Sequence, residues 1–221
     1  MATYTSLGGS NTCGHGLQAL RQSFPLLLFR ELRHRGEVGK HRQSCVAAMG
    51  PTLAASCAAW MVPPETTIAT IEYLPNMGLG DLSEELHSID ILLRRLRLLG
   101  AFVIGIEIVP FRPLRSRLPP RHECPSCTQP AHAEAAHALL AAKFAQYNAS
   151  VVTLRGVETN NSKLFLADGR HLNANGHSLV ARMVMEKWHT RGHRLSPNAG
   201  RHSVGFDSET GVCYLAVPTL L

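Results

Sequence analysis

Short apolar stretches alternate along this chain with longer segments whose apolar residues recur every three or four positions. The first pattern is typical of buried strands and the second of amphipathic helices. Alternation of the two predicts a parallel sheet covered by helices on both faces. We expect strands at about Thr3–Leu7, Cys45–Met49, Thr67–Leu74, Ala101–Val109 and Ser150–Leu154, and helices at about Leu17–Arg35, Thr52–Met61, Ser83–Leu99, Ala133–Tyr147 and Gly176–Trp188.

Two of these segments carry specific expectations. The helix Ser83–Leu99 has the clearest apolar stripe, with Ser83 placed to cap its start and Gly100 placed to end it. The strand Thr3–Leu7 holds two threonines and a serine, which is an unfavourable composition for the centre of a sheet.

The periodic pattern fades after His189, and this predicts the domain organisation. We expect one α/β domain over residues 1–190 and a C-terminal tail over residues 191–221, which resembles the start of an incomplete β-rich segment. Residues 110–130 form a stretch rich in proline and arginine, typical of a loop or lid-like insertion. A chain of 221 residues is long enough for one well-buried core.

Composition and charge exclude several classes of protein. Hydrophobic residues at 45% and charged residues at 17% are typical of a globular chain. The net charge of +6 invites a nucleic-acid partner, but the arginines of residues 94–97 and 110–130 have no aromatic residues interleaved as stacking platforms. We therefore expect a solvated basic face and no nucleic-acid partner. No apolar run approaches the ~20 residues of a membrane span, so none is expected.

The cellular location stays open at this stage. The first ten residues lack the basic and then apolar pattern of a signal peptide. Two tripeptides, Asn148-Ala149-Ser150 and Asn160-Asn161-Ser162, match the acceptor pattern for N-glycosylation and favour the secretory pathway slightly. The oligomeric state is open as well.

A glycine-rich segment, Leu7 to Gly14, brings Ser10 to the end of the first predicted strand. Ligands bind at this carboxyl edge in open parallel sheets, so the hydroxyl of Ser10 is a candidate nucleophile. The alternative is a phosphate-binding loop, but the segment lacks the lysine of that motif.

Asp168 and His171 form a second candidate pair. A serine nucleophile needs a base, and the base needs an acceptor on its other ring nitrogen. Three residues of separation in a turn allow the Asp168 carboxylate to face Nδ1 of His171. The alternative is a surface loop in which Asn175 caps the last helix, and we expect His177 to be structural.

Asn76 follows the third predicted strand and is the third element. Its amide could donate to the oxyanion that forms when Ser10 attacks a carbonyl. The alternative is an ordinary turn asparagine after Pro75.

In this order, Ser10, Asn76, Asp168 and His171 resemble the conserved blocks of the SGNH hydrolases, also called the GDSL lipase/esterase family. The resemblance extends from Leu7 to Trp188 and is greatest to plant and algal members. It implies a flavodoxin-like three-layer α/β/α fold with about five parallel strands. It also implies Ser10 as nucleophile, His171 as base, Asp168 as its orienting acid, and no metal or cofactor. The oxyanion hole would combine the Ser10 N–H, a glycine N–H and the Asn76 side chain.

The sequence departs from the family pattern at several positions. Gly9 stands where the family has an aspartate, and Met77 where an acid often follows the asparagine. The segment Val46 to Thr52 corresponds to the family's glycine block. In this block Pro51 aligns with the usual glycine, and proline has no N–H to donate. We expect Gly50 to supply the oxyanion donor in its place.

The six cysteines are too few for a disulfide scaffold in a chain of this length. Cys124 and Cys127, with His122 before them, have part of the spacing of a zinc site. Because the second ligand pair, His132 and His137, is irregular, we favour a disulfide or free thiols and expect no metal.

The sequence thus predicts a serine esterase that hydrolyses acyl, plausibly acetyl, esters of a carbohydrate or lipid-like substrate through an acyl-serine intermediate. Two alternatives remain from the same fold. One is a catalytically impaired protein that binds glycan, and the other is an O-acetyltransferase.

Overall fold

The computed structural model describes residues 2–77, 81–108, 130–154 and 163–190. All of its described helices and strands fall inside the predicted domain of residues 1–190. The tail of residues 191–221 and nearly all of the proline- and arginine-rich segment lie outside the described residues, so those predictions stand as they were.

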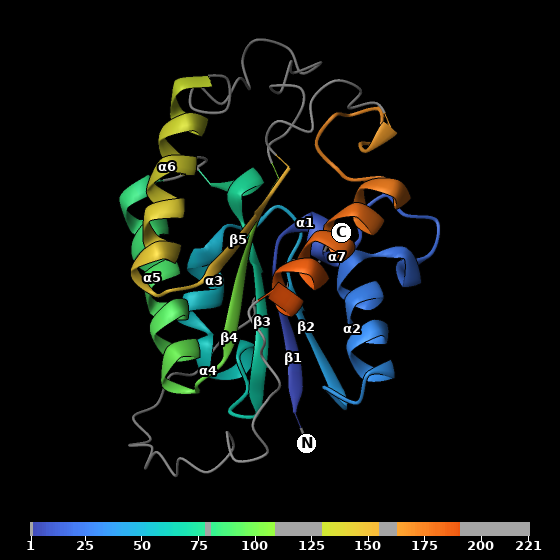
Figure 1. The fold of residues 1–221 in the computed structure, drawn as a ribbon. Coiled ribbons are helices and arrows are strands. Elements are labelled where there is room, and N and C mark those ends of the chain that lie inside the picture. Colours follow the sequence, from blue (N-terminus) through green and yellow to red (C-terminus); the bar gives the residue numbers. More distant parts are fainter. Residues whose placement is uncertain (1, 78–80, 109–129, 155–162, 191–221) are drawn as a thin grey trace, which may run out of the picture.

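Five parallel strands form one sheet in the order β2-β1-β3-β4-β5 (Figure 1). This is the order of the flavodoxin-like doubly wound fold, whose switch point lies between β1 and β3. The predicted α/β class and the strand number are confirmed. The strands are β1 (Thr3–Gly8), β2 (Lys40–Cys45), β3 (Thr66–Glu72), β4 (Phe102–Glu107) and β5 (Ser150–Thr153).

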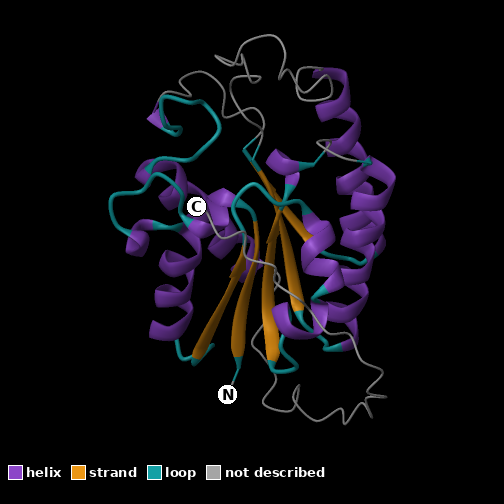
Figure 2. Cartoon of the chain, turned by 180° about the vertical axis from the view of Figure 1, so that it is seen from behind, coloured by secondary structure: helices purple, strands orange, loops and turns teal. Residues whose placement is uncertain are grey.

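Helices cover both faces of the sheet and give three layers (Figures 1 and 2). Successive strand residues alternate between two apolar clusters, with Tyr4 and Ile68 on one face and Leu7 and Ala69 on the other. The first face packs against α2 (Phe24–His34) and α7 (Ala174–Thr190), and the second against α3 (Pro51–Ser56), α4 (Ala58–Met61), α5 (Leu82–Leu98) and α6 (Pro130–Gln146).

The expectation that the first strand is unsuited to a central position is wrong. β1 lies between β2 and β3, and all six of its residues are buried. The hydroxyls of Tyr4 and Thr5 are satisfied by cross-strand hydrogen bonds, at 2.8 Å to Thr70 and at 2.8 Å to Thr66, whereas that of Thr3 has no partner among the described residues. A polar strand can occupy the centre when its neighbour supplies partners.

Three predicted elements are placed differently. The strand predicted at Cys45–Met49 is wrong, because β2 ends at Cys45; as an edge strand it is polar and half-exposed, so it lacks an apolar run. The helix predicted from Leu17 begins only at Phe24, after a short 3₁₀ turn, η1 (Leu20–Gln22). The helix predicted over Thr52–Met61 is split into α3 and α4.

The start of α5 also differs from the prediction. Asp81, not Ser83, caps the helix, because its Oδ1 accepts hydrogen bonds from the N–H groups of Ser83 (2.8 Å) and Glu84 (3.4 Å). Across the described ranges, no helix is long and apolar enough to cross a membrane.

We expect Gly105→Ala to lower the free energy of unfolding by about 1–3 kcal/mol, because overpacking a filled core forces its neighbours to move. Gly105 lies in β4 beneath α6, and an added Cβ would be 2.5 Å from Cε2 of Phe144. Urea unfolding measures the loss. If the same substitution costs as much in a Phe144→Leu background, the ring of Phe144 is not the obstacle.

Candidate active site

A cavity of about 180 Å³ opens at the carboxyl edge of the sheet, near the switch point between β1 and β3. Strand β1 leads to Ser10 and strand β3 leads to Asn76, so the topology itself brings these two side chains to one place. The residues that line the cavity are Ser10, Asn11, His15, Ala47, Ala48, Pro75, Asn76, Arg170 and His171.

Ser10 begins a single helical turn, α1 (Ser10–Cys13), directly after β1. The carbonyl of Gly9 accepts the N–H of Cys13 at 3.1 Å, and the N–H of Gly9 donates to the carbonyl of Glu72 at 3.1 Å. This fixes the turn to the end of β3. The N–H of Ser10 lies in the first turn of a helix, where no intrahelical acceptor is available.

His171 reaches Ser10 from a loop 161 residues away in the chain. Its Nε2 lies 2.9 Å from the Oγ of Ser10, and its Nδ1 lies 2.6 Å from Oδ2 of Asp168. The Asp168 carboxylate accepts a hydrogen bond from Nδ1–H, so Nε2 is left to accept a hydrogen bond from the Ser10 hydroxyl. The structure therefore brings the three predicted residues into one hydrogen-bonded row.

The charge on Asp168 is stabilised where it lies. Partial burial would raise the pKa of this carboxyl, but hydrogen bonds from the His171 ring and from two backbone N–H groups outweigh burial and lower its pKa to about 2. Oδ1 accepts these N–H groups, from Arg170 at 2.9 Å and from His171 at 3.0 Å. The carboxylate thus stays ionised beside the ring at neutral pH.

The side chain of Asn11 joins the turn that carries Ser10 to the loop that carries His171, here called the histidine loop. Sequence reasoning missed this role. Its Oδ1 accepts the N–H of Leu172 at 2.8 Å, and its Nδ2 donates to the carbonyl of Arg170 at 3.4 Å. These bonds bracket His171 on both sides. Asn11 follows Ser10 in the recognised block, but nothing in the spacing identifies its partner.

Glu72, at the end of β3, lies buried below the serine turn. Its Oε2 accepts the N–H of Thr12 at 3.3 Å and the hydroxyl of Thr12 at 3.0 Å. Burial raises the pKa of Glu72 to about 8, and the hydrogen bonds from Thr12 and Gly9 offset only part of that effect. Glu72 is thus a mainly neutral acid at pH 7.

Asn76 lies in a 3₁₀ turn, η2 (Leu74–Asn76), and its amide points across the cavity wall. Nδ2 donates to the carbonyl of Met49 at 3.1 Å. A Cβ at position 9 would overlap Nδ2 of Asn76, so a side chain there would require this amide to move. Glycine at position 9 allows the amide to stay where it lies.

The glycine block is arranged differently from the expectation about Gly50. Ala47 and Ala48 line the cavity, and Gly50 is not among the lining residues. Gly50 is the N-cap of α3, with Pro51 at the first helical position, where a missing N–H costs nothing. The assignment of Gly50 as an oxyanion donor stays a prediction.

His177 and the start of α7 lie beside this loop. His177 is fully buried, and its Nδ1 accepts the N–H of Phe24 at 3.2 Å, an arrangement that favours the structural role expected for it. The cap proposed at Asn175 is wrong. Oδ1 of Asn173 instead accepts the N–H groups of Asn175 (2.9 Å) and Gly176 (3.1 Å).

A disulfide joins Cys13, at the end of α1, to Cys45, at the end of β2. The cysteine spacing alone could not identify this pair. His122, Cys124 and Cys127 of the zinc alternative lie outside the described residues. His137 is described, and its Nδ1 lies 3.1 Å from Oε2 of Glu107.

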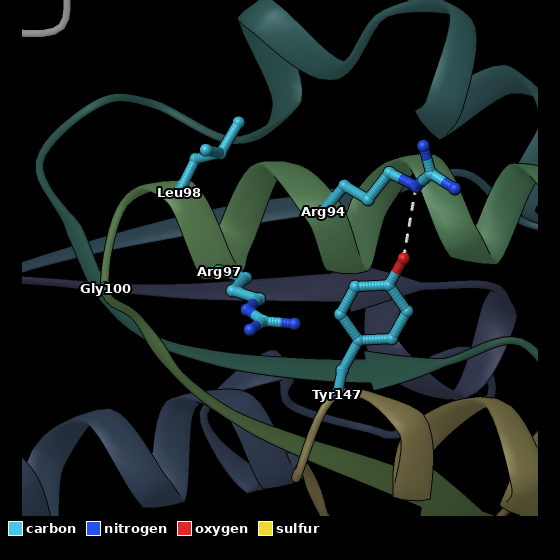
Figure 3. A pocket seen from close by; sticks show the side chains of 5 residues that line it. All are labelled: Arg94, Arg97, Leu98, Gly100 and Tyr147. Carbon is cyan, nitrogen blue, oxygen red and sulfur yellow. Dashed lines mark hydrogen bonds between the residues drawn. The ribbon is translucent and has the colours of Figure 1, made fainter.

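A larger, open hollow of about 710 Å³ lies at the opposite edge of the sheet, where α5 ends and β4 begins (Figure 3). Nε of Arg94 donates there to the hydroxyl of Tyr147 at 3.2 Å and lies 2.7 Å from Oδ2 of Asp90. Arg97 and Leu98 complete much of its lining. Among its described lining residues there is no serine, cysteine or histidine, so size alone does not identify the reactive site.

Comparison with solved structures identifies the fold. A psychrotrophic esterase, EstA from Pseudoalteromonas sp., inhibited by monoethylphosphonate, superposes with a TM-score of 0.64 at 17% identity, over 86% of this chain and 100% of that one. AlinE4, an SGNH-hydrolase family esterase, gives 0.56 at 16% identity, over 86% and 96%. The chain therefore has the fold of the SGNH hydrolases.

A two-domain esterase (CEX) active on acetylated mannans, crystallised with mannopentaose, gives a TM-score of 0.62 at 14% identity and covers 94% of this chain. The chain spans about half of that protein, 53% of its length. No protein-family model and no curated protein sequence matches the chain.

We expect Glu72→Gln to flatten the dependence of unfolding free energy on pH. Since folding raises the pKa of Glu72 from 4.5 to about 8, its favourable contribution is complete below pH 4.5 and is lost as the pH rises to about 8. As the pH rises, the free energy of unfolding of the unsubstituted protein should fall, relative to that of the variant, by up to about 1.4 kcal/mol per pH unit. Urea unfolding at pH 5, 6 and 7 measures both slopes, and parallel curves would contradict a buried neutral acid.

Proposed function

We propose that the chain is a serine esterase of the SGNH family. Ser10 attacks the carbonyl carbon of an ester, His171 takes the hydroxyl proton and passes it to the leaving alcohol, and Asp168 orients the ring and stabilises the imidazolium. Water, activated by His171, then releases the acyl group from Ser10. The reaction needs no cofactor.

The observation that carries the proposal is the row of hydrogen bonds from Ser10 through His171 to Asp168, at 2.9 and 2.6 Å. Such a row is uncommon without function, because a serine hydroxyl can be satisfied by any nearby carbonyl. Here the row also ends in a cavity, where a carbonyl could reach the hydroxyl.

For the oxyanion we propose the backbone N–H of Ser10 and the amide of Asn76, with the N–H of Gly50 as a third donor. The amide of Asn76 already lies at the cavity wall, and it would exchange the carbonyl of Met49 for the substrate oxygen. The third donor requires the loop that carries Ala47 and Ala48 to bring position 50 closer.

The proposed acyl group is short, and acetyl fits best. A cavity of about 180 Å³ at Ser10 leaves little room for a long chain. The likeness to an esterase active on acetylated mannans supports a carbohydrate as the alcohol.

We expect Ser10→Ala to reduce kcat for p-nitrophenyl acetate by on the order of 10⁴–10⁶-fold, as loss of a serine nucleophile does elsewhere. Steady-state release of p-nitrophenol measures it. Ser178→Ala, on the exposed side of α7, is the matched control and should retain full turnover.

Turnover that survives in Ser10→Ala would refute the proposed nucleophile. An inactive parent protein that binds an acetylated glycan by calorimetry would favour the impaired glycan-binding alternative. Acetylated product formed with an acceptor sugar would favour the transferase.

We expect Asp168→Asn to lower kcat by about 10²–10⁴-fold with little change in KM for a small ester, because the ring loses the acceptor that fixes its tautomer. Asp81→Asn is the control, since Asp81 also accepts backbone N–H groups but caps α5. Equal rates in the two variants would remove Asp168 from the mechanism.

A further inference from the structure

Among the residues that the structure describes, Arg170 is the one permanently charged side chain that lines the cavity at Ser10. It stands directly before His171 in the chain, and it is half-buried. A substrate group a few bonds from the reacting ester would therefore meet this guanidinium.

The backbone of Arg170 is held from two sides. Its N–H donates to Oδ1 of Asp168 at 2.9 Å, and its carbonyl accepts Nδ2 of Asn11 at 3.4 Å. Its Nη2 crosses to the other wall and donates to the carbonyl of Pro75 at 3.2 Å, next to Asn76. The guanidinium is thus positioned between the histidine loop and the asparagine turn.

The guanidinium has five N–H donors, and its contact with Pro75 uses a neutral acceptor. Within the part of the chain that the structure describes, no carboxylate forms an ion pair with Arg170. Asp168, its nearest acidic neighbour in the chain, uses its oxygens on the His171 ring and on backbone N–H groups.

Among the described residues, two further acidic side chains lie near the glycine and serine segments, and neither forms an ion pair with Arg170. Burial raises the pKa of Glu72 to about 8, so this group is mainly uncharged at pH 7. Glu85 is buried, and its Oε1 lies next to Gly50. An arginine without a carboxylate partner at a cavity edge is suited to a ligand carboxylate, sulfate or phosphate, which it can bind with two parallel hydrogen bonds.

We propose that Arg170 is a specificity-determining residue that binds an anionic group of the substrate, so that the preferred substrate is an acyl ester of an acidic molecule, such as an acetylated acidic sugar. This inference rests on the proposed esterase function. It narrows the alcohol portion of the substrate to one that carries negative charge close to the ester.

The test compares two acetyl esters, 4-acetoxybenzoate, which is anionic, and methyl 4-acetoxybenzoate, which is neutral. Arg170→Gln should lower kcat/KM for the anionic ester about 10- to 100-fold more than for the neutral ester, the range of a lost hydrogen bond to a charged group. Dividing the anionic-to-neutral ratio of the variant by that of the unsubstituted protein cancels the difference in intrinsic reactivity between the two esters.

Two further variants control the result. Arg97→Gln, which removes an equal charge at the opposite edge of the sheet, should leave the ratio unchanged. Arg170→Lys keeps the charge without the planar fork and should give an intermediate ratio. Circular dichroism and urea unfolding establish that each variant is folded.

An equal loss on both esters in Arg170→Gln would overturn the proposal and leave Arg170 a positioning residue. The proposal would also be overturned if Arg97→Gln changed the anionic-to-neutral ratio of kcat/KM as strongly as Arg170→Gln does. If the unsubstituted protein turns over neither ester, the proposed function fails; if it turns over both and the ratio ignores Arg170, only the present inference fails.

Discussion

A hydrogen bond of 2.9 Å between the Oγ of Ser10 and Nε2 of His171 joins the two ends of the described domain. Three independent restraints hold its partners in place. The serine turn is tied to the end of β3, Asn11 reaches over to the histidine loop, and Asp168 holds the far side of the ring. The loss of any of these contacts would weaken the hydrogen bond between Ser10 and its proposed base, His171.

The strand order is what makes this meeting possible. Because β1 is central and its neighbours run parallel, the residues after β1 and β3 emerge at the same edge and turn to opposite faces. The loop before α7 then closes the cavity from a third direction. Arg170, for which we propose a role in binding an anionic group, lies in this same loop next to His171. The same hydrogen bonds therefore position both residues.

Much of this could be predicted from the sequence, for identifiable reasons. Buried strands such as β3 and β4 are continuous apolar runs, and α5 has a regular stripe, so pattern alone located them. Ser10, Asn76, Asp168 and His171 were proposed because their residue types suit acyl-serine chemistry and because their order along the chain resembles that of the SGNH hydrolases. Pattern could not show β2, which is an edge strand with a polar sequence. It also could not show the central position of β1, whose Tyr4 and Thr5 hydroxyls have their partners in β3. The links made by Asn11, Glu72 and Arg170 depend on contacts between distant residues, which spacing does not encode.

Reaction with an ethyl fluorophosphonate, followed by peptide mapping by mass spectrometry, tests the central claim most directly. An activated serine displaces fluoride and keeps the phosphonyl group, whatever the natural substrate is. The account predicts one adduct, on Ser10, that fails to form when His171 is replaced by alanine. An unmodified protein, or an adduct on a different residue, would contradict it.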